Sequence, residues 1–372
     1  MRYLPTISLC MIVKNDEETL DACLNCASGI ADEIIIADIG STDRTKEIAK
    51  KHTDKIYDYK WKDDFSAARN FSFEQAAMDY ILWLDADDVL LEDDRILLLR
   101  LKEELDESVD AVMMRHNIDF DTYGNPVCWR YGERLIKRSR GFKWTEPVNE
   151  YLKTEGNIIQ SDIAITRKEN KKAVKGRYIE IYAGLLSEGK QLSPRGNYYY
   201  ARELKDCGKI DEAIERFNLF LQTKKGLTED CINACCELAQ CYVLKNMPEL
   251  AFLSLLNTFT FDVPRAQACC MIGCLLMDKK EYRKAAFWFE LASTLKAPEY
   301  NREFVNSDYS DFIPFMELAV CHDRLGEWER AEIFNNKAGE CKPQSLEFLY
   351  NKKYFASLKQ KNEMDKSQKS AL

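Results

Sequence analysis

The feature that most constrains how this chain folds is a series of short apolar runs of strand length, separated by segments with helical character. The runs cover residues 7–13, 33–37 and 80–84. Helices are predicted between them, including residues 44–51 and 65–78. Buried strands separated by helices favour a parallel sheet with right-handed crossovers. Such a sheet binds its ligands at the carboxyl ends of the strands.

Polar and acidic residues follow each apolar run, where a strand would end. Asn15 and Glu17 follow the first run, Asp38, Ser41 and Asp43 follow the second, and Asp85, Ala86, Asp87 and Asp88 follow the third. We expect these residues to form one binding site. The carboxylates of the last group repel one another, which favours a bound Mg2+ or Mn2+ that also contacts substrate phosphates. The alternative interpretation is an acidic helix cap in a solvated loop.

The second half of the chain is predicted to be helical and repetitive. From about residue 110 short strands and turns are expected, and from about residue 171 four helical segments can be superimposed. The matching positions are Ala201, Ala213 and Phe217; Ala239, Ala251 and Leu255; Gly273, Ala285 and Phe289; and Ala319, Ala331 and Asn335. Gly208, Asn246, Lys280 and Gly326 fall at the turn between the two helices. The middle alanines are 38, 34 and 46 residues apart, which resembles the tetratricopeptide repeat.

These patterns divide the chain into an α/β domain over residues 1–170, a helical repeat domain over 171–358 and a charged tail over 359–372, expected to be disordered. The net charge of −9 argues against nucleic acid or an anionic membrane as the main partner. No apolar run approaches the ~20 residues of a transmembrane helix and no signal peptide is recognised, so a cytoplasmic protein is expected. Its 14 cysteines are then expected to be reduced.

The motifs in the first quarter of the chain resemble those of the large inverting glycosyltransferase family that includes the cellulose and chitin synthases. The segments that carry the resemblance are residues 8–20, 37–43, 65–70 and 83–88. The resemblance implies a Rossmann-like GT-A domain with a mixed sheet and a UDP-sugar as donor. It also implies that Asp38 lies in the nucleotide pocket and that Asp85 and Asp87 bind ribose and metal. Many family members have a second acid where this chain has Ile39.

Two further segments, residues 61–70 and 142–150, resemble the sublancin-type glycosyltransferases, which modify a peptide. That group commonly has Val-His-Glu where this chain has Val-Asn149-Glu150. If the histidine is a metal ligand in the family, Asn149 supplies a weaker oxygen or the ligand is lost. An inverting transfer needs a base for the acceptor proton. Glu150 is the first candidate and Glu146 the second, with simple surface acidity as the alternative for both.

Arg69 has a physical rationale of its own. A guanidinium can make bidentate, charge-assisted hydrogen bonds to the diphosphate of a donor. The alternative is a surface ion pair with Asp63 or Asp64.

Three functions are compatible with these observations. The first is transfer of a sugar to a peptide or protein that the helical repeats bind. The run Tyr198 to Tyr200 contributes rings to the acceptor path in that hypothesis, with ordinary helix packing as the alternative. The second is transfer to a saccharide or lipid-linked acceptor, with the repeats forming a homodimer. The third is a degenerate transferase domain that serves as a binding scaffold.

Overall fold

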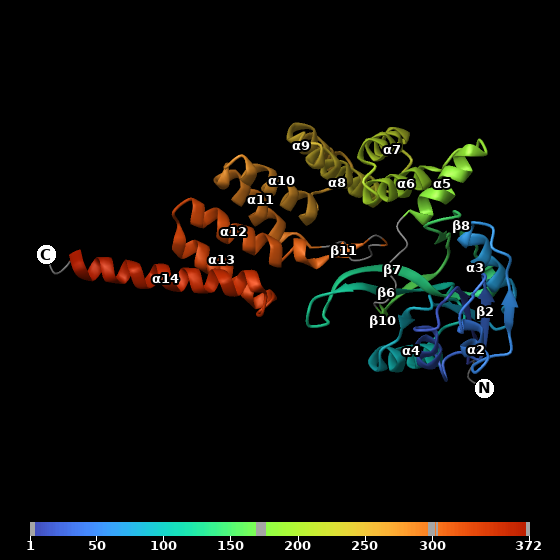
Figure 1. The fold of residues 1–372 in the computed structure, drawn as a ribbon. Coiled ribbons are helices and arrows are strands. Elements are labelled where there is room, and N and C mark those ends of the chain that lie inside the picture. Colours follow the sequence, from blue (N-terminus) through green and yellow to red (C-terminus); the bar gives the residue numbers. More distant parts are fainter. Residues whose placement is uncertain (1–3, 169–175, 297–301, 303, 370–372) are drawn as a thin grey trace. The chain divides into compact units, whose positions relative to one another are not determined.

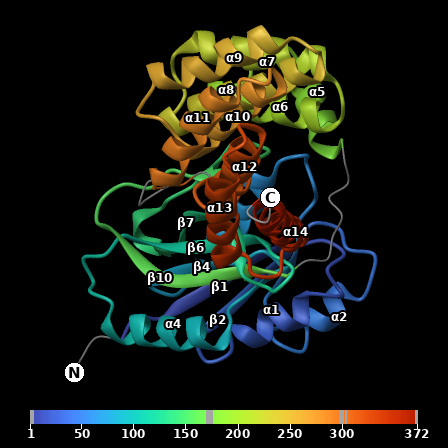
Figure 2. The same cartoon turned by 90° about the vertical axis from the view of Figure 1, so that its left-hand side faces the viewer.

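The structure, a computed structural model, describes residues 4–168, 176–296, 302 and 304–369. The chain divides into two compact units, which are described separately. The first comprises residues 1–200 with 300–304, and the second comprises residues 201–299 with 305–372. Figures 1 and 2 show the elements of both units.

The first unit is built on a mixed sheet with the strand order β3-β2-β1-β4-β7-β6-β10-β5. The strands are β1 (Ile7–Val13), β2 (Glu33–Asp38), β3 (Ile56–Asp58), β4 (Tyr80–Trp83), β5 (Asp88–Val89), β6 (Ala111–Phe120), β7 (Pro126–Lys137) and β10 (Ile158–Arg167). Strands β1 to β4 are parallel, as predicted, and β7 pairs antiparallel with both β4 and β6. Because Val13 pairs with Asp38, the polar loops after β1 and β2 begin at the same edge.

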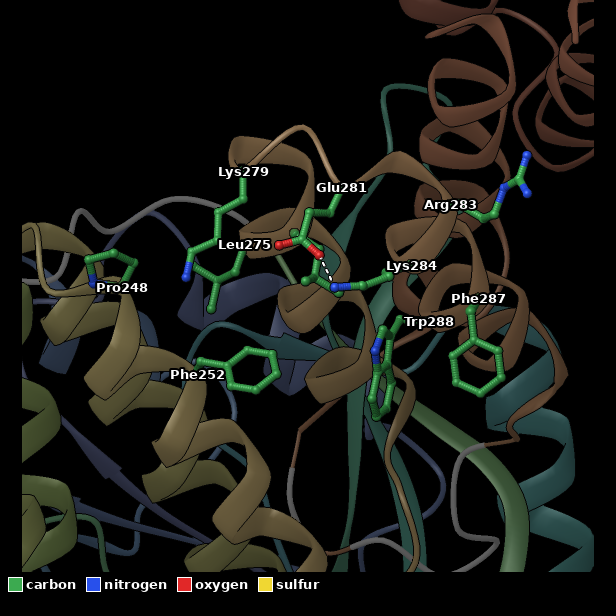
Figure 3. Close-up of a pocket in the computed structure, with 10 residues that line it drawn as sticks. Pro248, Phe252, Leu275, Lys279, Glu281, Arg283, Lys284, Phe287 and Trp288 are labelled. Carbon is green, nitrogen blue, oxygen red and sulfur yellow. Dashed lines mark ion pairs between the residues drawn. The ribbon is translucent and has the colours of Figure 1, made fainter. Parts of the chain in front are cut away.

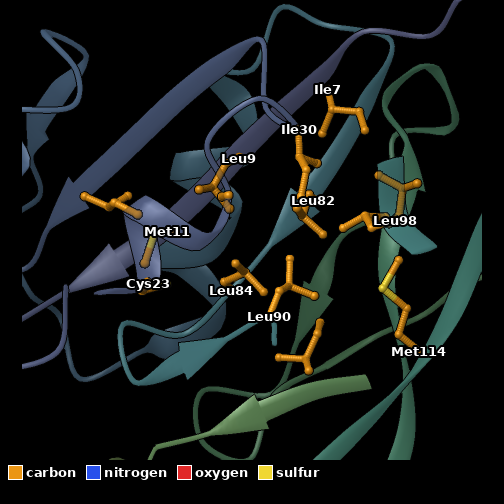
Figure 4. Close-up of a cluster of buried hydrophobic side chains, with 14 of the residues drawn as sticks. Ile7, Leu9, Met11, Cys23, Ile30, Leu82, Leu84, Leu90, Leu98 and Met114 are labelled. Carbon is orange, nitrogen blue, oxygen red and sulfur yellow. The ribbon is translucent and has the colours of Figure 1, made fainter. Parts of the chain in front are cut away.

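Helices cover both faces of this sheet. They are α1 (Leu20–Cys26), α2 (Thr45–Ala49), α3 (Phe65–Glu74) and α4 (Glu92–Glu104). The unit also contains α5 (Arg177–Ser187), the 3-10 turn η1 (Arg138–Arg140) and a small hairpin of β8 (Trp144–Thr145) and β9 (Tyr151–Leu152). Alternate residues of β1 point to opposite faces. Leu9 and Met11 join Leu82 and Leu84 in one core, against α1 and α4 (Figure 4). Cys10 joins a second cluster on the other face.

Two predictions for the first unit are corrected. The region after residue 110 contains strands of 10, 12 and 10 residues rather than short ones. Many β7 residues are only half-buried, which weakens the apolar pattern that reveals long strands. Helix α3 ends at Glu74 rather than near Met78. Two N–H groups further along instead donate to side chains, that of Ala77 to Glu33 and that of Met78 to the Ser8 hydroxyl.

The first unit also extends beyond residue 170, where we predicted its end. Helix α5 belongs to it, with Ile181 and Tyr182 buried. The Tyr178 ring packs edge-on against Phe65, and the Tyr182 hydroxyl donates to the Val148 carbonyl. Helix α6 (Pro194–Asp206) crosses the division between the units at residues 200 and 201.

The second unit consists of helical hairpins. Its helices are α7 (Ile210–Thr223), α8 (Thr228–Leu244), α9 (Pro248–Asn257), α10 (Ala266–Asp278), α11 (Tyr282–Thr294), α12 (Phe312–Arg324), α13 (Trp328–Cys341) and α14 (Leu346–Lys369), with η2 (Thr258–Thr260), η3 (Ser307–Tyr309) and the short strand β11 (Val305–Asn306). The successive pairs α8/α9, α10/α11 and α12/α13 pack together (Figure 1). The repeat prediction is confirmed, since Ala213, Ala251, Ala285 and Ala331 are all fully buried.

The predicted inter-helix turns share one backbone conformation. Gly208, Asn246, Lys280 and Gly326 all have a positive φ, between 57° and 79°. In each turn the N–H of the following residue donates to a carbonyl five positions earlier, as between Glu281 and Leu276. This is the Schellman motif, which satisfies the last carbonyls of a helix and favours glycine at the left-handed position. Asn246 and Lys280 adopt the conformation without being glycine.

Helix α14 runs through residue 359 to Lys369, into the segment for which disorder was expected. Lysine, glutamine, glutamate and methionine, which make up much of that segment, are good helix formers. In the described part of the chain, no helix has the length and apolar character needed to cross a bilayer.

Candidate active site

The loops that follow β1 and β2 are joined by reciprocal hydrogen bonds. The Asn15 N–H donates to the Ser41 hydroxyl at 3.0 Å, and Asn15 Oδ1 accepts from the Thr42 N–H at 2.7 Å. Asn15 has a φ of 55°, a conformation that asparagine tolerates better than most residues. Asn15 and Ser41 were both predicted as site residues, and the structure brings them together.

A second set of contacts joins the same two loops. The Glu17 N–H donates to Asp43 Oδ2 at 3.2 Å, and the Glu17 carboxylate accepts from both the backbone and the side chain of Arg44. The predicted residues Glu17 and Asp43 therefore meet at the carboxyl edge of the sheet, where they stabilise the loops through one another.

Asp38, predicted to lie in the nucleotide pocket, is the last residue of β2. Its side chain is fully buried, and both carboxylate oxygens accept from the Ser41 N–H, at 2.9 and 3.1 Å. Lys46 lies 3.4 Å from Oδ2. Both carboxylate oxygens of Asp38 are thus engaged within the protein, and its place in a nucleotide pocket stays a prediction. Asp38 also shapes the turn that positions Ser41.

At the end of β4, Arg69 links two carboxylates that the sequence assigned to different roles. Its Nη2 donates to Asp85 Oδ1 and its Nε donates to Glu150 Oε1, both at 2.7 Å. Burial disfavours the guanidinium charge, but Asp85 and Glu150 outweigh it and raise the pKa of Arg69. Burial likewise opposes ionisation of Asp85, yet the Arg69 charge lowers the pKa of that carboxyl. The alternative pairing of Arg69 with Asp63 or Asp64 is not observed.

Two tryptophans hold the Arg69 guanidinium in place. Its central carbon lies 5.0 Å from the Trp83 ring centre and 4.7 Å from that of Trp144. Asn70, the next residue, exchanges two hydrogen bonds with the backbone of Trp144, at 2.9 and 3.0 Å. The segments 61–70 and 142–150, recognised separately in the sequence, are thus bonded to each other.

Asp87 pairs with an arginine that sequence reasoning missed. Arg167, the last residue of β10, donates from Nε to Asp87 Oδ2 at 2.9 Å. Burial first, and the charge of Asp85 second, raise the pKa of Asp87. An ionised Asp87 is therefore destabilised by its neighbours, and a cation at this position would relieve that cost.

Asp88, predicted to contact the donor, is buried in an ion-pair network, and that contact stays a prediction. Its side chain is fully buried; Oδ2 accepts from Arg134 Nη1 at 2.8 Å, and Oδ1 lies 2.9 Å from His116 Nε2. The Asp85 N–H donates to Asp88 Oδ2. Burial opposes its ionisation, but Arg134 and then His116 lower the pKa of Asp88 well below its usual range.

Arg134 and His116 were not predicted to belong to the site. The Arg134 guanidinium carbon lies 3.8 Å from the Trp83 ring centre, and the side chain is about 1% exposed. The only signal in the sequence was a charged residue directly before the apolar pair Leu135 and Ile136. Nothing in the spacing linked it to Asp88, which lies 46 positions earlier.

The remaining predicted residues lie around this cluster. Ala86 is buried between Asp85 and Asp87. Asn149 has a φ of 53°, and its Nδ2 is buried without a hydrogen-bond partner among the described residues. Glu146 Oε2 lies 3.5 Å from the position a Cβ would take at Gly196, so its side chain is oriented toward the start of α6.

The tyrosines proposed for the acceptor path are packing residues. Tyr198, Tyr199 and Tyr200 are between 1% and 6% exposed. Tyr198 and Tyr199 contact each other edge-on, and the Tyr199 hydroxyl accepts from Arg195. The expectation that these rings face an acceptor is therefore corrected in favour of helix packing.

The fit of a divalent cation rests on Asp85 and Asp87. Among the described residues no group of three or more His, Cys, Asp or Glu side chains is arranged to hold a metal. One oxygen of each of these two carboxylates is engaged by an arginine, and burial together with the charge of Asp85 raises the pKa of Asp87. Mg2+ commonly uses one or two carboxylates and takes its other ligands from substrate phosphates and water. The pair fits that mode.

The first unit has the mixed sheet and the acidic loop after β4 that are expected of a GT-A-type fold, and the second unit consists of helical hairpin repeats. Residues 8–164 match the sequence model of glycosyl transferase family 2. This part of the chain is therefore similar in sequence to the glycosyltransferases of that family.

Three similar proteins illustrate the relationship. A TPR repeat-containing protein of Synechococcus elongatus is 35% identical over 148 residues, covering 39% of this chain and 35% of that protein. The SPbeta prophage-derived glycosyltransferase SunS of Bacillus subtilis is 26% identical over 224 residues, covering 57% of this chain and 52% of SunS. The lipopolysaccharide core biosynthesis glycosyltransferase LpsC of Rhizobium meliloti is 29% identical over 160 residues, covering 41% of this chain and 58% of LpsC. The chain thus spans well under two thirds of the length of these relatives.

Proposed function

We propose that the protein is a metal-dependent, inverting glycosyltransferase that moves a sugar from a UDP-sugar to a peptide or protein acceptor. The observation that carries this proposal is the Asp85–Arg69–Glu150 arrangement. It places a candidate metal-binding carboxylate and a candidate base on one guanidinium within a family 2 domain.

In this proposal Asp85 and Asp87 hold Mn2+ or Mg2+, which when bound neutralises the leaving diphosphate. Asn15, Ser41 and the loop residues bonded to them line the nucleotide side, since they lie at the ends of the neighbouring strands. Asn149, beside Glu150, is kept as a weaker candidate metal ligand.

Glu150 is proposed as the base that removes the acceptor proton. Its side chain is 13% exposed, and Arg69 engages Oε1. Among the described residues no hydrogen bond engages Oε2, so that oxygen is the one available to an acceptor. Arg69 orients the carboxylate through this hydrogen bond. Glu146 remains the second candidate.

A peptide acceptor is supported by cavities within the helical unit. One, of about 530 Å3, lies between α9, α10 and α11, with Phe252, Trp288 and Phe287 as aromatic walls and Lys279 and Lys284 at its edge (Figure 3). A second, of about 870 Å3, lies between α7, α8 and α9. Aromatic walls with a charged rim suit side chains of an extended polypeptide.

The donor half of the proposal is tested with a panel of nucleotide-sugars, scored by metal-dependent hydrolysis and by thermal shift. UDP with Mn2+ or Mg2+ should raise the melting temperature, because a ligand bound by the folded state stabilises it by mass action. Asp87→Asn should remove the metal dependence and leave the protein folded. Asp93→Asn, an exposed acid in the first turn of α4, is the matched control and should behave like the parent. No metal-dependent shift with millimolar UDP would refute the donor assignment.

A saccharide or lipid-linked acceptor is the second candidate, favoured by the similarity to a lipopolysaccharide core glycosyltransferase. The repeats would then serve as a support or a homodimer contact. An acceptor screen of peptides against oligosaccharides separates the two. It should use the intact chain, since α6 crosses the division between the units. A degenerate scaffold, the third possibility raised by Ile39 and Asn149, would hydrolyse no donor. We also propose a cytoplasmic location, in keeping with the 14 free cysteines.

A further inference from the structure

Two cysteines in the last turn of α1 contact the acidic loop that follows β4. Cys23 and Cys26 are three positions apart, and α1 ends at Cys26. Cys23 is fully buried in the core beside Leu84 and Leu90 (Figure 4), whereas Cys26 is half-buried. Their side chains also interact with each other.

These thiols engage both ends of the loop that carries the candidate metal-binding carboxylates. The Cys23 thiol donates to the Asp85 carbonyl, with an S–O distance of 3.4 Å. The Leu90 N–H donates to the Cys26 sulfur at 3.2 Å, and the Cys26 thiol donates to the Cys23 carbonyl at 3.0 Å. Residues 85 to 90 therefore depend at their start and at their end on two neighbouring thiols.

We propose that Cys23 and Cys26 form an oxidisable dithiol site whose conversion to a disulfide disorganises the loop from Asp85 to Leu90. The oxidant is a small disulfide such as oxidised glutathione. The inference rests on the proposed function only for its activity readout, because disulfide formation and loop opening are measured independently.

The reaction balances as two thiol–disulfide exchanges. The Cys26 thiolate attacks one sulfur of the small disulfide, whose S–S bond breaks and releases one thiolate. The Cys23 thiolate then attacks the Cys26 sulfur of the mixed disulfide and releases the second thiolate. The two protein thiols lose two electrons and two protons, and the small disulfide becomes two thiols. Cys26 is the entry point, because its thiol is half-buried whereas that of Cys23 is fully buried.

Closing the bond requires a local movement. Side chains three apart on a helix have Cβ atoms roughly 5–6 Å apart, whereas a disulfide needs about 3.8 Å. Because α1 ends at Cys26, its last turn can tighten without breaking helix further along. Oxidation also removes both S–H donors, so the Asp85 carbonyl loses its hydrogen bond from Cys23. The loop then has fewer contacts at Asp85, which is the residue that bonds Arg69.

The test incubates the full chain in glutathione buffers of increasing oxidising strength. Alkylation, proteolysis and mass spectrometry then locate the linkage. We expect a Cys23–Cys26 disulfide, faster amide hydrogen exchange in residues 85–90, and donor hydrolysis reduced on the order of tenfold or more. Dithiothreitol should reverse all three changes.

Other cysteines provide the controls. Cys26→Ser retains a hydroxyl for Leu90 and Cys23 but cannot form the disulfide, so its loop exchange and hydrolysis should not respond to oxidation. A Cys274→Ser, Cys341→Ser double variant removes two exposed thiols and should respond like the parent. Absence of the Cys23–Cys26 linkage in every buffer, or a linkage that leaves exchange in residues 85–90 unchanged, overturns the proposal. If the linkage and the exchange change appear but the parent hydrolyses no donor, the dithiol site stands and the proposed function fails.

Discussion

Replacing Asp88 by asparagine tests whether this residue supports the site or contacts a ligand. In the structure its carboxylate is fully buried between Arg134 and His116, and Arg134 is itself about 1% exposed. Asparagine keeps an oxygen for the Asp85 N–H but leaves the buried guanidinium without its counter-charge. Removing one partner of a buried ion pair typically costs about 3–5 kcal/mol. For a unit of this size that corresponds to a melting temperature lower by roughly 6–20 °C.

The assay is thermal and urea denaturation of the full chain, with Asp87→Asn as the matched variant. Asp87 and its partner Arg167 are partly exposed, so their ion pair contributes about 1 kcal/mol or less. Asp87→Asn should therefore melt close to the parent. Adding Arg134→Met to Asp88→Asn should recover part of the loss, because it removes the unpaired charge.

The difference in stability between the parent and Asp88→Asn should depend on pH, because the pKa of Asp88 is lowered in the folded state. A carboxyl with a depressed folded pKa contributes stability that is present above its unfolded value of about 3.9 and is lost as pH falls toward the folded one. The difference in the free energy of unfolding between the parent and Asp88→Asn should be constant near neutrality and shrink below about pH 4. An Asp88→Asn protein that melts like the parent but no longer binds UDP and metal would refute this reasoning and restore Asp88 as a ligand.

Three further outcomes are expected. Lys280→Gly should stabilise the helical unit by up to about 1 kcal/mol in urea denaturation, because Lys280 adopts a left-handed conformation with φ 60°. Gly273→Ala should destabilise the helical unit by about 1–3 kcal/mol, since the added Cβ would lie 2.6 Å from the buried Phe289 ring. The control Gly184→Ala, in α5, places its Cβ in open space and should be neutral or stabilising. Metal-dependent UDP binding, followed by thermal shift, should weaken as pH falls toward the raised pKa of Asp87, because a proton competes with the cation there; binding unchanged down to pH values near 4 would contradict this.

Local patterns in the sequence were sufficient for the framework of both units. The strand β1 has the predicted bounds because a continuous apolar run of that length reports burial on both faces. The repeat positions and the four turns were also predictable, since a small residue and a left-handed turn residue recur at nearly fixed spacing. The loops after β1 and β2 could be placed together because parallel strands end at one edge.

The tertiary structure decided which acids are accessible. Asp85, Asp87 and Asp88 are nearly adjacent in sequence and chemically alike, yet one bonds Arg69, one bonds Arg167 and one is buried with Arg134 and His116. Those partners come from α3, β10, β7 and β6, and no local pattern records such long-range pairings. The same holds for Cys23 and Cys26, because only the folded chain places the two ends of the acidic loop against their sulfurs. Sequence periodicity reports which residues are buried, whereas the partner of a buried charge or thiol depends on how distant strands are ordered in the sheet.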